Sequence, residues 1–182
     1  MRKTGAGLAA AFICCMLLMG GAGQGWSQTQ TVARAHADTS MTLRLAAAPA
    51  VVFPLFGPVR EAEWSPHWNP KILFPVEKEQ VAGTVFTTKH GDGEAVWVMD
   101  TYDPARLHIV YVIVVPGMVA TRLEILLKAG AKDTTEAVVA YHYTALSEAG
   151  DEFVRENAKD DPGEREHWEH ALNRRLAEMK EK

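Results

Sequence analysis

The amino-acid sequence predicts an α+β fold, in which a curved antiparallel sheet of about seven strands wraps around a long C-terminal helix. Apolar and polar residues alternate with a period of two over residues 76–146, which is typical of strands. The breaks in that alternation are short and carry turn residues, so neighbouring strands pair as antiparallel hairpins. The last 20 residues instead carry apolar side chains at helical spacing.

The first residues, 1–27, have the three parts of a cleavable signal peptide. Two basic residues are followed by an almost wholly apolar stretch at 8–19, which is too short to span a bilayer comfortably. Small residues then crowd positions 20–27. We expect cleavage after Ser27, with cleavage after Ala37 or an uncleaved anchor as alternatives. The protein is therefore predicted to be exported and periplasmic, or secreted if its host has a single membrane.

Cysteine content and charge exclude several classes of function. Cys14 and Cys15 lie inside the apolar stretch, so the mature chain has no disulfide, thiolate metal site or cysteine nucleophile. Loss of the two basic residues with the signal changes the net charge from −4 to −6. A chain of that sign without a cluster of basic residues is not expected to bind nucleic acid.

The mature chain opens with residues 28–40, which are polar and small and are predicted to form a flexible lead-in. A first strand is predicted over residues 41–48. Pro49 then opens a short apolar helix over residues 50–56, and one or two helical turns follow over residues 59–64. These two segments are the two short helices after the first strand.

Residues 64–70 contain too many prolines for a helix or a central strand, and we expect an ordered connection rich in aromatic residues. Six strands then follow as a meander. They are predicted at residues 76–81, 84–90, 94–102, 106–115, 118–128 and 134–146.

Two helices close the chain. Ser147 is predicted to cap a helix that runs to about residue 158. Asp161 is predicted to cap the final helix, with Pro162 at its first position and Glu164 at its third. The apolar residues of the final helix form one stripe that faces the sheet, and these are Trp168, Leu172, Leu176 and Met179.

The order of these elements resembles the SRPBCC superfamily, also called START-like or helix-grip proteins. Within it, residues 41–182 are most similar to the small bacterial polyketide cyclase/dehydrase and lipid-transport type. The motifs that carry the resemblance are short, and their order is the stronger signal. They are Val52–Leu55, Trp64–Trp68, Val85–Thr88, Val96–Val98, Tyr102–Pro104, Pro116–Gly117, Thr121–Glu124, Tyr141–Ser147 and Trp168–Leu172.

The resemblance implies an apolar cavity between the sheet and the long helix. Alternation places Tyr141 and Tyr143 on the face toward that helix, where their hydroxyls either orient a ligand or simply pack and bond to the backbone. Thr121 and Leu123 share the inner face of the preceding strand. The residues expected to line the cavity are Trp64, Trp68, Phe86, Trp97, Tyr111, Thr121, Leu123, Tyr141, Tyr143, Phe153, Trp168 and Leu172.

The cavity mouth is predicted at the end of the sheet that carries His90, Val115 and Met118. Val115 and Met118 flank a Pro-Gly turn and make an unusually apolar hairpin tip. One interpretation is a lip that touches a membrane or a partner during ligand exchange. The other is that both side chains pack against Phe153 or a neighbouring loop.

No catalytic residue is predicted, because the chain lacks a nucleophile elbow, a Walker-type phosphate loop and a dinucleotide fingerprint. Arg122 and Glu124 are expected to form an exposed ion pair of little energetic value. Glu166 and His170 can meet on one helix face but have no third ligand, so neither a metal nor a cofactor is expected. His90 is expected to be structural, with acid–base chemistry at the mouth as the alternative.

The leading hypothesis is an exported binding or carrier domain for a hydrophobic or amphipathic small molecule, with lipids among the candidates and transient membrane contact during exchange. A cyclase- or dehydratase-type enzyme that uses the same cavity is the first alternative. A protein-interaction domain with a vestigial pocket is the second. Superfamily members share no common chemistry, so the resemblance alone does not decide among the three.

Overall fold

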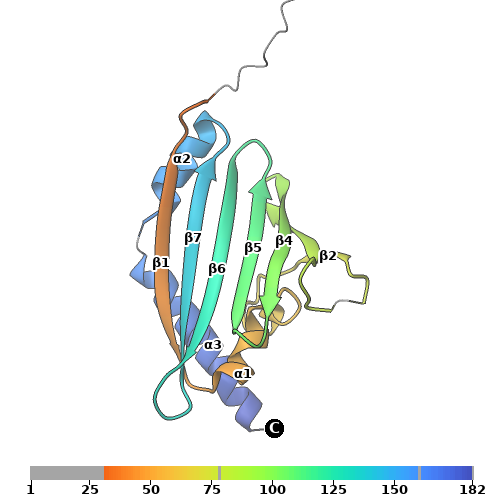
Figure 1. Cartoon of the computed structure of the whole chain (residues 1–182), viewed down its shortest axis with the longest axis vertical. Coiled ribbons are helices and arrows are strands. Elements are labelled where there is room, and N and C mark those ends of the chain that lie inside the picture. Colours follow the sequence, from red (N-terminus) through yellow and green to blue (C-terminus); the bar gives the residue numbers. More distant parts are fainter. Residues whose placement is uncertain (1–30, 78, 160, 182) are drawn as a thin grey trace, which may run out of the picture. The chain divides into compact units, whose positions relative to one another are not determined.

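The computed structural model describes residues 31–77, 79–159 and 161–181, and the residues from Ala33 onward form one compact unit. The predicted signal peptide lies outside the described residues. A single antiparallel sheet of seven strands runs in the order β1-β7-β6-β5-β4-β3-β2 (Figure 1). In chain order the strands are β1 (His36–Leu45), β2 (Lys71–Phe74), β3 (Val85–His90), β4 (Gly93–Asp103), β5 (His108–Val115), β6 (Val119–Ala129) and β7 (Thr135–Ala145).

The predicted meander is confirmed, because β2 to β6 each pair with the next strand along the chain and β1 pairs with β7. Two of the hairpin turns require glycine. Gly91 between β3 and β4 and Gly117 between β5 and β6 have φ angles of 55° and 71°, a region that residues with a side chain rarely adopt.

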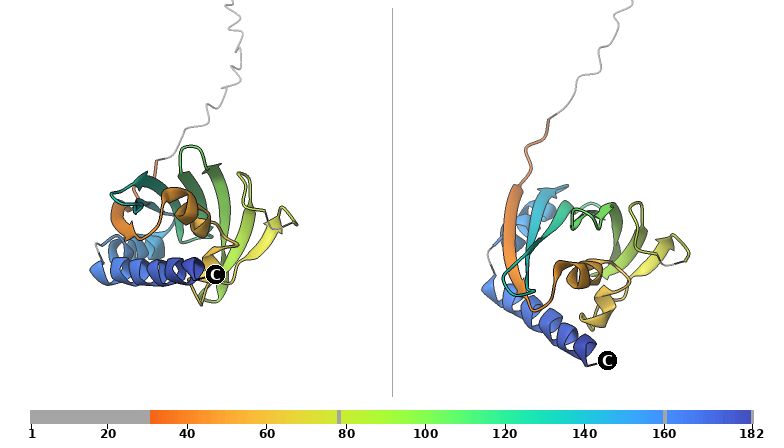
Figure 2. Two further views of the ribbon diagram at one scale, coloured as in Figure 1. Left: turned by 90° about the horizontal axis from the view of Figure 1, so that it is seen from below. Right: turned by 60° about the horizontal axis from the view of Figure 1, so that its bottom comes forward.

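The helices lie on the concave side of the sheet. Figure 2 shows α3 crossing the open side of the curved strands, while the α1 segment occupies the hollow at one end. The helices are α1 (Pro49–Val52), the 3₁₀ helices η1 (Phe53–Phe56) and η2 (Glu61–Glu63), α2 (Glu148–Asn157) and α3 (Pro162–Lys180). None of these described helices is long and apolar enough to span a membrane.

Both predicted helix starts are confirmed. The Ser147 hydroxyl accepts a hydrogen bond from the Gly150 N–H at 3.1 Å and caps α2. The Asp161 carboxylate accepts one from the Gly163 N–H at 2.9 Å and caps α3, with Pro162 at the first helical position. The predicted stripe of α3 faces the sheet, since Leu172 and Leu176 are buried and Trp168 and Met179 pack beside them.

Helix α3 is also tied to the free edge of β1 by hydrogen bonds from its side chains. The Glu169 carboxylate accepts from the Arg44 N–H at 2.6 Å, and the Asn173 side chain bonds both the Ala46 N–H and the Arg44 carbonyl at 2.8 and 3.0 Å. These contacts satisfy backbone groups that an edge strand would otherwise leave open. They fix the position of α3 over the concave face.

The first strand begins earlier than predicted. It starts at His36, so residues 36–40 belong to β1 and not to a flexible lead-in. Just before it, Asp151 of α2 accepts hydrogen bonds from the Ala35 N–H at 2.7 Å and from the Arg34 guanidinium at 3.0 Å. The polar composition of this segment resembles a linker because its outward residues face solvent along a sheet edge.

The strand predicted over residues 76–81 is wrong. This segment contains no strand among its described residues, and the edge strand β2 lies earlier, at Lys71–Phe74. Pro70 and Pro75 flank those four residues. Proline is tolerated at the ends of an edge strand because only one side of it needs a complete ladder of hydrogen bonds.

Candidate functional site

The concave face of the sheet is organised in rows of side chains that run across neighbouring strands. Tyr111, Leu123, Tyr141 and Thr39 are directly opposite one another on β5, β6, β7 and β1. Tyr143 lies one row further along β7. The rings of Tyr141 and Tyr143 stack in parallel, with 5.6 Å between their centroids and 1° between their planes. The two tyrosines therefore present one aromatic wall to the helices, as the alternation predicted.

The residues predicted to line a cavity fall into two groups. Six are buried in the core, and these are Trp64, Phe86, Tyr111, Thr121, Leu123 and Leu172. The other six remain partly exposed, and these are Trp68, Trp97, Tyr141, Tyr143, Phe153 and Trp168. The structure thus brings the predicted set to one side of the sheet and concentrates its accessible surface on the second group.

Aromatic side chains hold the buried part of this interior. Phe86 and Trp97 stack at 5.3 Å, and the edge of Trp68 meets Trp97 at 5.4 Å. On the helix side, the edge of Trp64 meets Trp168 of α3 at 5.3 Å. Such edge-to-face and stacked pairs are each worth about 0.5–1.5 kcal/mol beyond the area that they bury.

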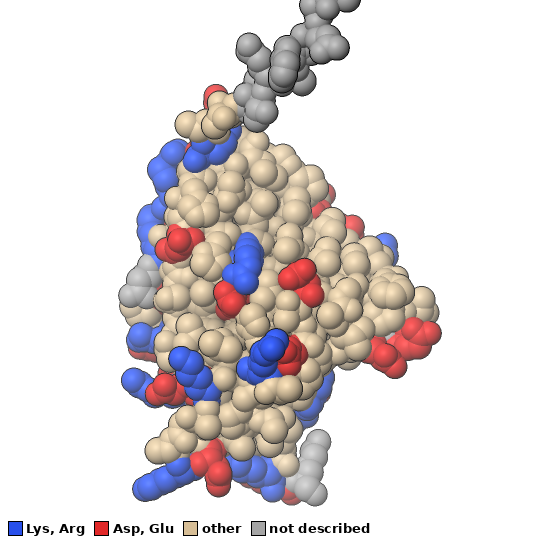
Figure 3. Space-filling model, in the orientation of Figure 1, with Lys and Arg blue, Asp and Glu red and all other residues tan. Residues whose placement is uncertain are grey.

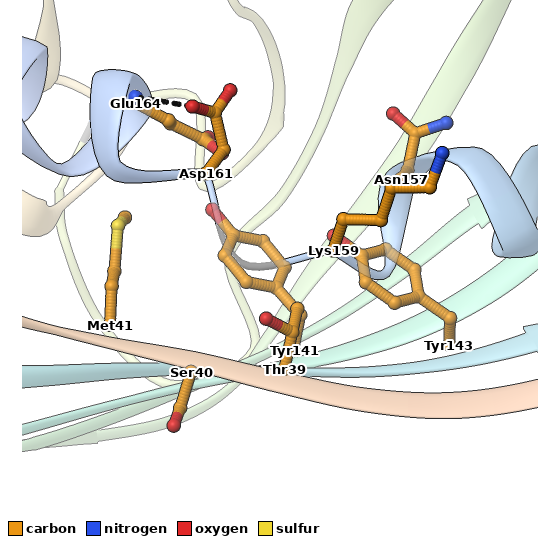
Figure 4. Close-up of a pocket in the computed structure, with 9 residues that line it drawn as sticks. All are labelled: Thr39, Ser40, Met41, Tyr141, Tyr143, Asn157, Lys159, Asp161 and Glu164. Carbon is orange, nitrogen blue, oxygen red and sulfur yellow. Dashed lines mark hydrogen bonds between the residues drawn. The ribbon is translucent and has the colours of Figure 1, made fainter.

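A recess opens between strands β1 and β7 and the segment that joins α2 to α3 (Figure 4). Tyr141 and Tyr143 point into it, and Glu164 and Asp161 lie above Tyr141 while Lys159 lies by Tyr143. The other residues along the recess are Thr39, Ser40, Met41 and Asn157, of which Ser40 points away. The recess encloses about 20 Å³, which is space for roughly one water molecule.

The tyrosine hydroxyls in the recess differ from that of Tyr111. The Tyr111 hydroxyl donates to the Phe56 carbonyl at 2.8 Å. Among the described residues, no hydrogen bond involves the hydroxyl of Tyr141 or Tyr143. Burial, followed by the negative charge of Glu164, raises the pKa of Tyr143 to about 12 and that of Tyr141 well above its usual value. Both hydroxyls therefore stay protonated at physiological pH and are available to a bound molecule.

Glu61 is the least expected residue of the site. The residue is partly accessible to solvent, and burial raises the pKa of its carboxyl group from 4.5 to about 8. Burial raises the pKa values of Tyr111 and Tyr141, and the negative charge of Glu61 adds to both shifts. No hydrogen bond or ion pair in the described part of the chain involves this carboxyl group.

Glu63, only two residues away, has the opposite environment. Its carboxylate binds the Arg60 guanidinium at 2.7 Å and the Arg175 guanidinium of α3 at 2.6 Å. The Arg60 hydrogen bond and the other charged contacts lower its pKa to about 2. The three-residue helix η2 thus carries one carboxylate that pairs with two cations and one whose pKa is raised by burial.

The predicted mouth is packed. The Phe153 ring meets the edges of His90 and Tyr143, with centroids 6.0 and 6.5 Å apart. Val115 and Met118 are partly buried and pack on a second small core around Val119, Ala145 and Val154. Of the two interpretations of this hairpin tip, the geometry therefore favours packing against α2 over an exposed lip.

The outer face of the sheet carries charged side chains of both signs, interspersed rather than grouped (Figure 3). The predicted pair is present, with Arg122 Nη1 at 2.6 Å from Glu124 Oε2. His108 also binds Glu124 at 2.6 Å, a contact that the sequence did not indicate. Within the described ranges, no three acidic or histidine side chains form a cluster able to hold a metal ion.

Sequence reasoning missed Glu61 and the role of Glu164, Lys159 and Met41 in the recess. Glu61 lies in a helix of three residues, which is too short for a periodic pattern to show its inward side. Met41 carried a usable signal, because it shares a face with Leu43 and Leu45 on β1. Glu164 was visible only as the third residue of a capped helix.

No protein-family model matches the chain, and no curated protein matches its sequence. Norcoclaurine synthase from Thalictrum flavum is structurally similar, with a TM-score of 0.62 and 12% identity over 84% of this chain and 95% of that one. A START superfamily protein from Mycobacterium smegmatis has a TM-score of 0.58 and 16% identity over 79% and 99%. Major latex-like protein 151 from Panax ginseng has a TM-score of 0.55 and 11% identity over 79% and 97%. These likenesses concern the fold, and the chain has the predicted helix-grip fold.

Proposed function

We propose that the domain binds an apolar or amphipathic small molecule between the concave face of the sheet and α3. The observation that carries this proposal is the set of polar groups without a protein partner inside an aromatic interior. These are the hydroxyls of Tyr141 and Tyr143, whose stacked rings line the recess. Neither hydroxyl is completely buried, so each can exchange its contact with water for a hydrogen bond to a ligand. A ligand with a polar head and an apolar body satisfies both the polar groups and the aromatic wall.

Ligand binding requires the recess to widen. Its volume of about 20 Å³ is far below that of an alkyl chain or an aromatic ring. The wall opposite the tyrosines is formed by the end of α2 and the start of α3, and the hydrogen bonds from α3 to the backbone of Arg44 and Ala46 come from Glu169 and Asn173. A ten-carbon chain contributes about 8 kcal/mol in gross transfer free energy, of which association and ordering costs remove a large part.

The biological setting follows from the predicted signal peptide. We infer that the mature domain acts outside the cytoplasm as a binding or carrier protein, with lipids among the candidate ligands. The START superfamily likeness supports a binding role. Norcoclaurine synthase, which has been solved in complex with dopamine and hydroxybenzaldehyde, supports an aromatic or amphipathic ligand of small size.

An enzyme of the cyclase or dehydratase kind is the second candidate, and Glu61 is the observation that favours it. With a pKa of about 8, its carboxyl group is protonated at neutral pH and has the driving force of a general acid. Recovery of the bound molecule distinguishes the two. A carrier returns its ligand chemically unchanged after prolonged incubation, whereas an enzyme returns a product.

The binding proposal is tested by titrating the protein with decan-1-ol and following tryptophan fluorescence, since Trp168 and Trp97 border the interior. Two variants on β1 form a matched pair. Thr39→Phe places a ring in the recess, and Ser40→Phe places the same ring on the opposite face. We expect Thr39→Phe to weaken binding at least tenfold and Ser40→Phe to leave it unchanged. Equal affinity in both variants would contradict the proposed site, and absence of decan-1-ol binding by the unmodified protein would contradict the proposed function.

A further inference from the structure

The segment around β2 exposes several apolar side chains close together. Of the nine large apolar residues that are exposed in the described chain, four lie between positions 73 and 81, and these are Leu73, Phe74, Val76 and Val81. Single exposed apolar residues are ordinary, whereas a group of them marks a contact site. Figures 1 and 2 show this segment projecting beyond the edge of the sheet, on the side away from β1. We call these four residues the β2 patch.

The backbone of β2 accounts for this exposure. Ile72 lies opposite Phe86 of β3 and Phe74 lies opposite Val85, so β2 has one more residue than its partner at this point. Such a bulge interrupts the regular alternation of a strand. Ile72 packs against the core, whereas Leu73 and Phe74, which follow it, are both exposed. The fold therefore holds two adjacent apolar side chains outside the core.

The free edge of β2 is poorly suited to pair with another strand. β2 is the last strand of the sheet, and its four residues lie between Pro70 and Pro75 and contain the bulge. Short length, flanking proline and bulges are the features by which edge strands avoid pairing. A partner of the β2 patch therefore contacts its side chains and does not extend the sheet.

The area and charge of the β2 patch favour a lipid surface over a protein. Its four residues expose roughly 400 Å², which is half of the area that each partner buries in a stable protein–protein interface. A bilayer needs no shape complementarity, and its affinity grows with the apolar area buried and with attraction between charges. Residues 71–79 contain two lysines and two glutamates, and the whole chain has a net charge of −4. A zwitterionic bilayer is therefore favoured over an anionic one.

A groove lies between the β2 patch and the aromatic interior. It has a volume of about 410 Å³, and it is lined by residues 58–59, 62 and 68–72. Trp68 and Ile72 line this groove and also pack against the core. The edge of the Trp68 ring meets Trp97 and Phe86, with centroids 5.4 and 5.9 Å apart. Apolar surface thus continues from the β2 patch along the groove to the interior.

We propose that the β2 patch is a docking surface for a zwitterionic lipid bilayer. Leu73, Phe74 and Val76 enter the boundary between head groups and acyl chains, and the groove beside them faces the bilayer. The proposal goes beyond the binding function proposed above, because docking uses only the outside of the domain. It also assigns membrane contact to β2, since the predicted lip at Val115 and Met118 is packed against α2.

The experiment measures flotation of the protein with phosphatidylcholine vesicles. The test variant carries Leu73→Ser, Phe74→Ser and Val76→Ser. The matched control variant also loses three exposed apolar side chains, through Val96→Ser, Val112→Ser and Leu146→Ser. We expect the test variant to lower the partition coefficient at least tenfold and the control variant to leave it unchanged. Urea unfolding checks that both variants fold, and decan-1-ol titration of the test variant should match that of the unmodified protein.

A second readout locates the contact. With vesicles of brominated phosphatidylcholine, the tryptophan added by Phe74→Trp should be quenched, whereas the one added by Val112→Trp should not. Binding should also persist when the salt concentration rises from about 0.1 to about 1 M, which shortens the Debye length from about 10 to about 3 Å.

Four outcomes would overturn the proposal. They are absence of vesicle binding, equal loss of binding in the two triple variants, binding that requires anionic lipid and disappears in high salt, and a dimer in sedimentation that the test variant alone abolishes. The last outcome would show that the β2 patch binds a second copy of the chain. If decan-1-ol still binds in any of these cases, the proposed binding function stands while the docking surface does not.

Discussion

The two carboxylates of η2, Glu61 and Glu63, are expected to change the free energy of unfolding with pH in opposite directions. The Glu61→Gln variant tests this expectation most directly. In the folded protein the pKa of Glu61 is raised from 4.5 to about 8 by burial. Between these two values the folded state keeps a proton that the unfolded state has lost. Stability therefore falls as pH rises from about 4.5 to about 8. Replacement by neutral glutamine removes this loss.

The size of the effect follows from the pKa change. A rise from 4.5 to about 8 corresponds to at most about 5 kcal/mol. Because part of the residue is accessible to solvent, we expect about 1–3 kcal/mol of this to be realised. Glu61→Gln should therefore change the free energy of unfolding little at pH 5, and stabilise the protein by about 1–3 kcal/mol relative to the unmodified chain at pH 8.5.

Glu63→Gln is the control. Its pKa is lowered from 4.5 to about 2 by Arg60 and the other cationic contacts, so its contribution is complete above about pH 4.5 and is lost only below that value. The ion pair is partly exposed, so its removal should cost about 1 kcal/mol, equally at pH 5 and pH 8.5.

The assay is urea unfolding followed by tryptophan fluorescence at half-unit steps from pH 5 to 8.5. At each pH the free energy of unfolding of the unmodified protein is subtracted from that of the variant. The difference removes the contribution of titratable groups that both proteins share, including Glu164, whose pKa is also raised by burial. A Glu61→Gln difference that does not change with pH would refute the enclosed, unpaired carboxyl group. If Glu61→Gln instead became less stable than the unmodified protein as pH rises, that result would indicate a cationic partner for Glu61 in solution.

Further outcomes are expected from the packing. Trp168→Ala should lower the free energy of unfolding by about 3 kcal/mol, because the ring packs on the core but is partly exposed, and a loss below about 1 kcal/mol would mean that α3 is not held by this stripe. Gly150→Ala should destabilise by about 1–3 kcal/mol in urea unfolding although alanine favours helices, since the new methyl group would lie against the Met118 carbonyl of the β5–β6 turn; a more stable variant would place α2 further from that turn. The pair Val115→Ser and Met118→Ser should destabilise by more than about 1 kcal/mol, whereas an unchanged stability with slower ligand transfer from vesicles would restore the exposed lip. N-terminal sequencing of the exported protein should begin at Gln28, and an intact initiator methionine would indicate an anchor instead of a cleaved signal.

The sequence was most informative where the structure is periodic. β3 to β7 and the two long helices lie within about two residues of their predicted bounds, because tight turns and caps such as Ser147 mark their ends chemically. β2 was misplaced since four residues between prolines show no period. The start of β1 was hidden because its outward residues, such as Asp38 and Ser40, are as polar as a linker.

The site was predicted only in outline. The alternation of apolar and polar residues placed Tyr141 and Tyr143 on the inner face of the sheet. It does not reveal that six of the twelve predicted lining residues are buried in the core and that the other six keep accessible surface. That division depends on how tightly side chains from distant segments pack. The pKa values of Tyr111 and Tyr141 depend likewise on Glu61, which is 50 and 80 positions away in the chain.

The central claim is that the interior between the sheet and α3 accepts a small amphipathic molecule. An alternative binding surface lies around β2, where Leu73, Phe74 and Val76 are 48%, 58% and 80% exposed and also offer apolar area. The most direct measurement is a set of NMR nuclear Overhauser effects between the alkyl protons of bound decan-1-ol and the protein. We predict contacts with the rings of Tyr141 and Tyr143. Contacts confined to the β2 surface would contradict the account.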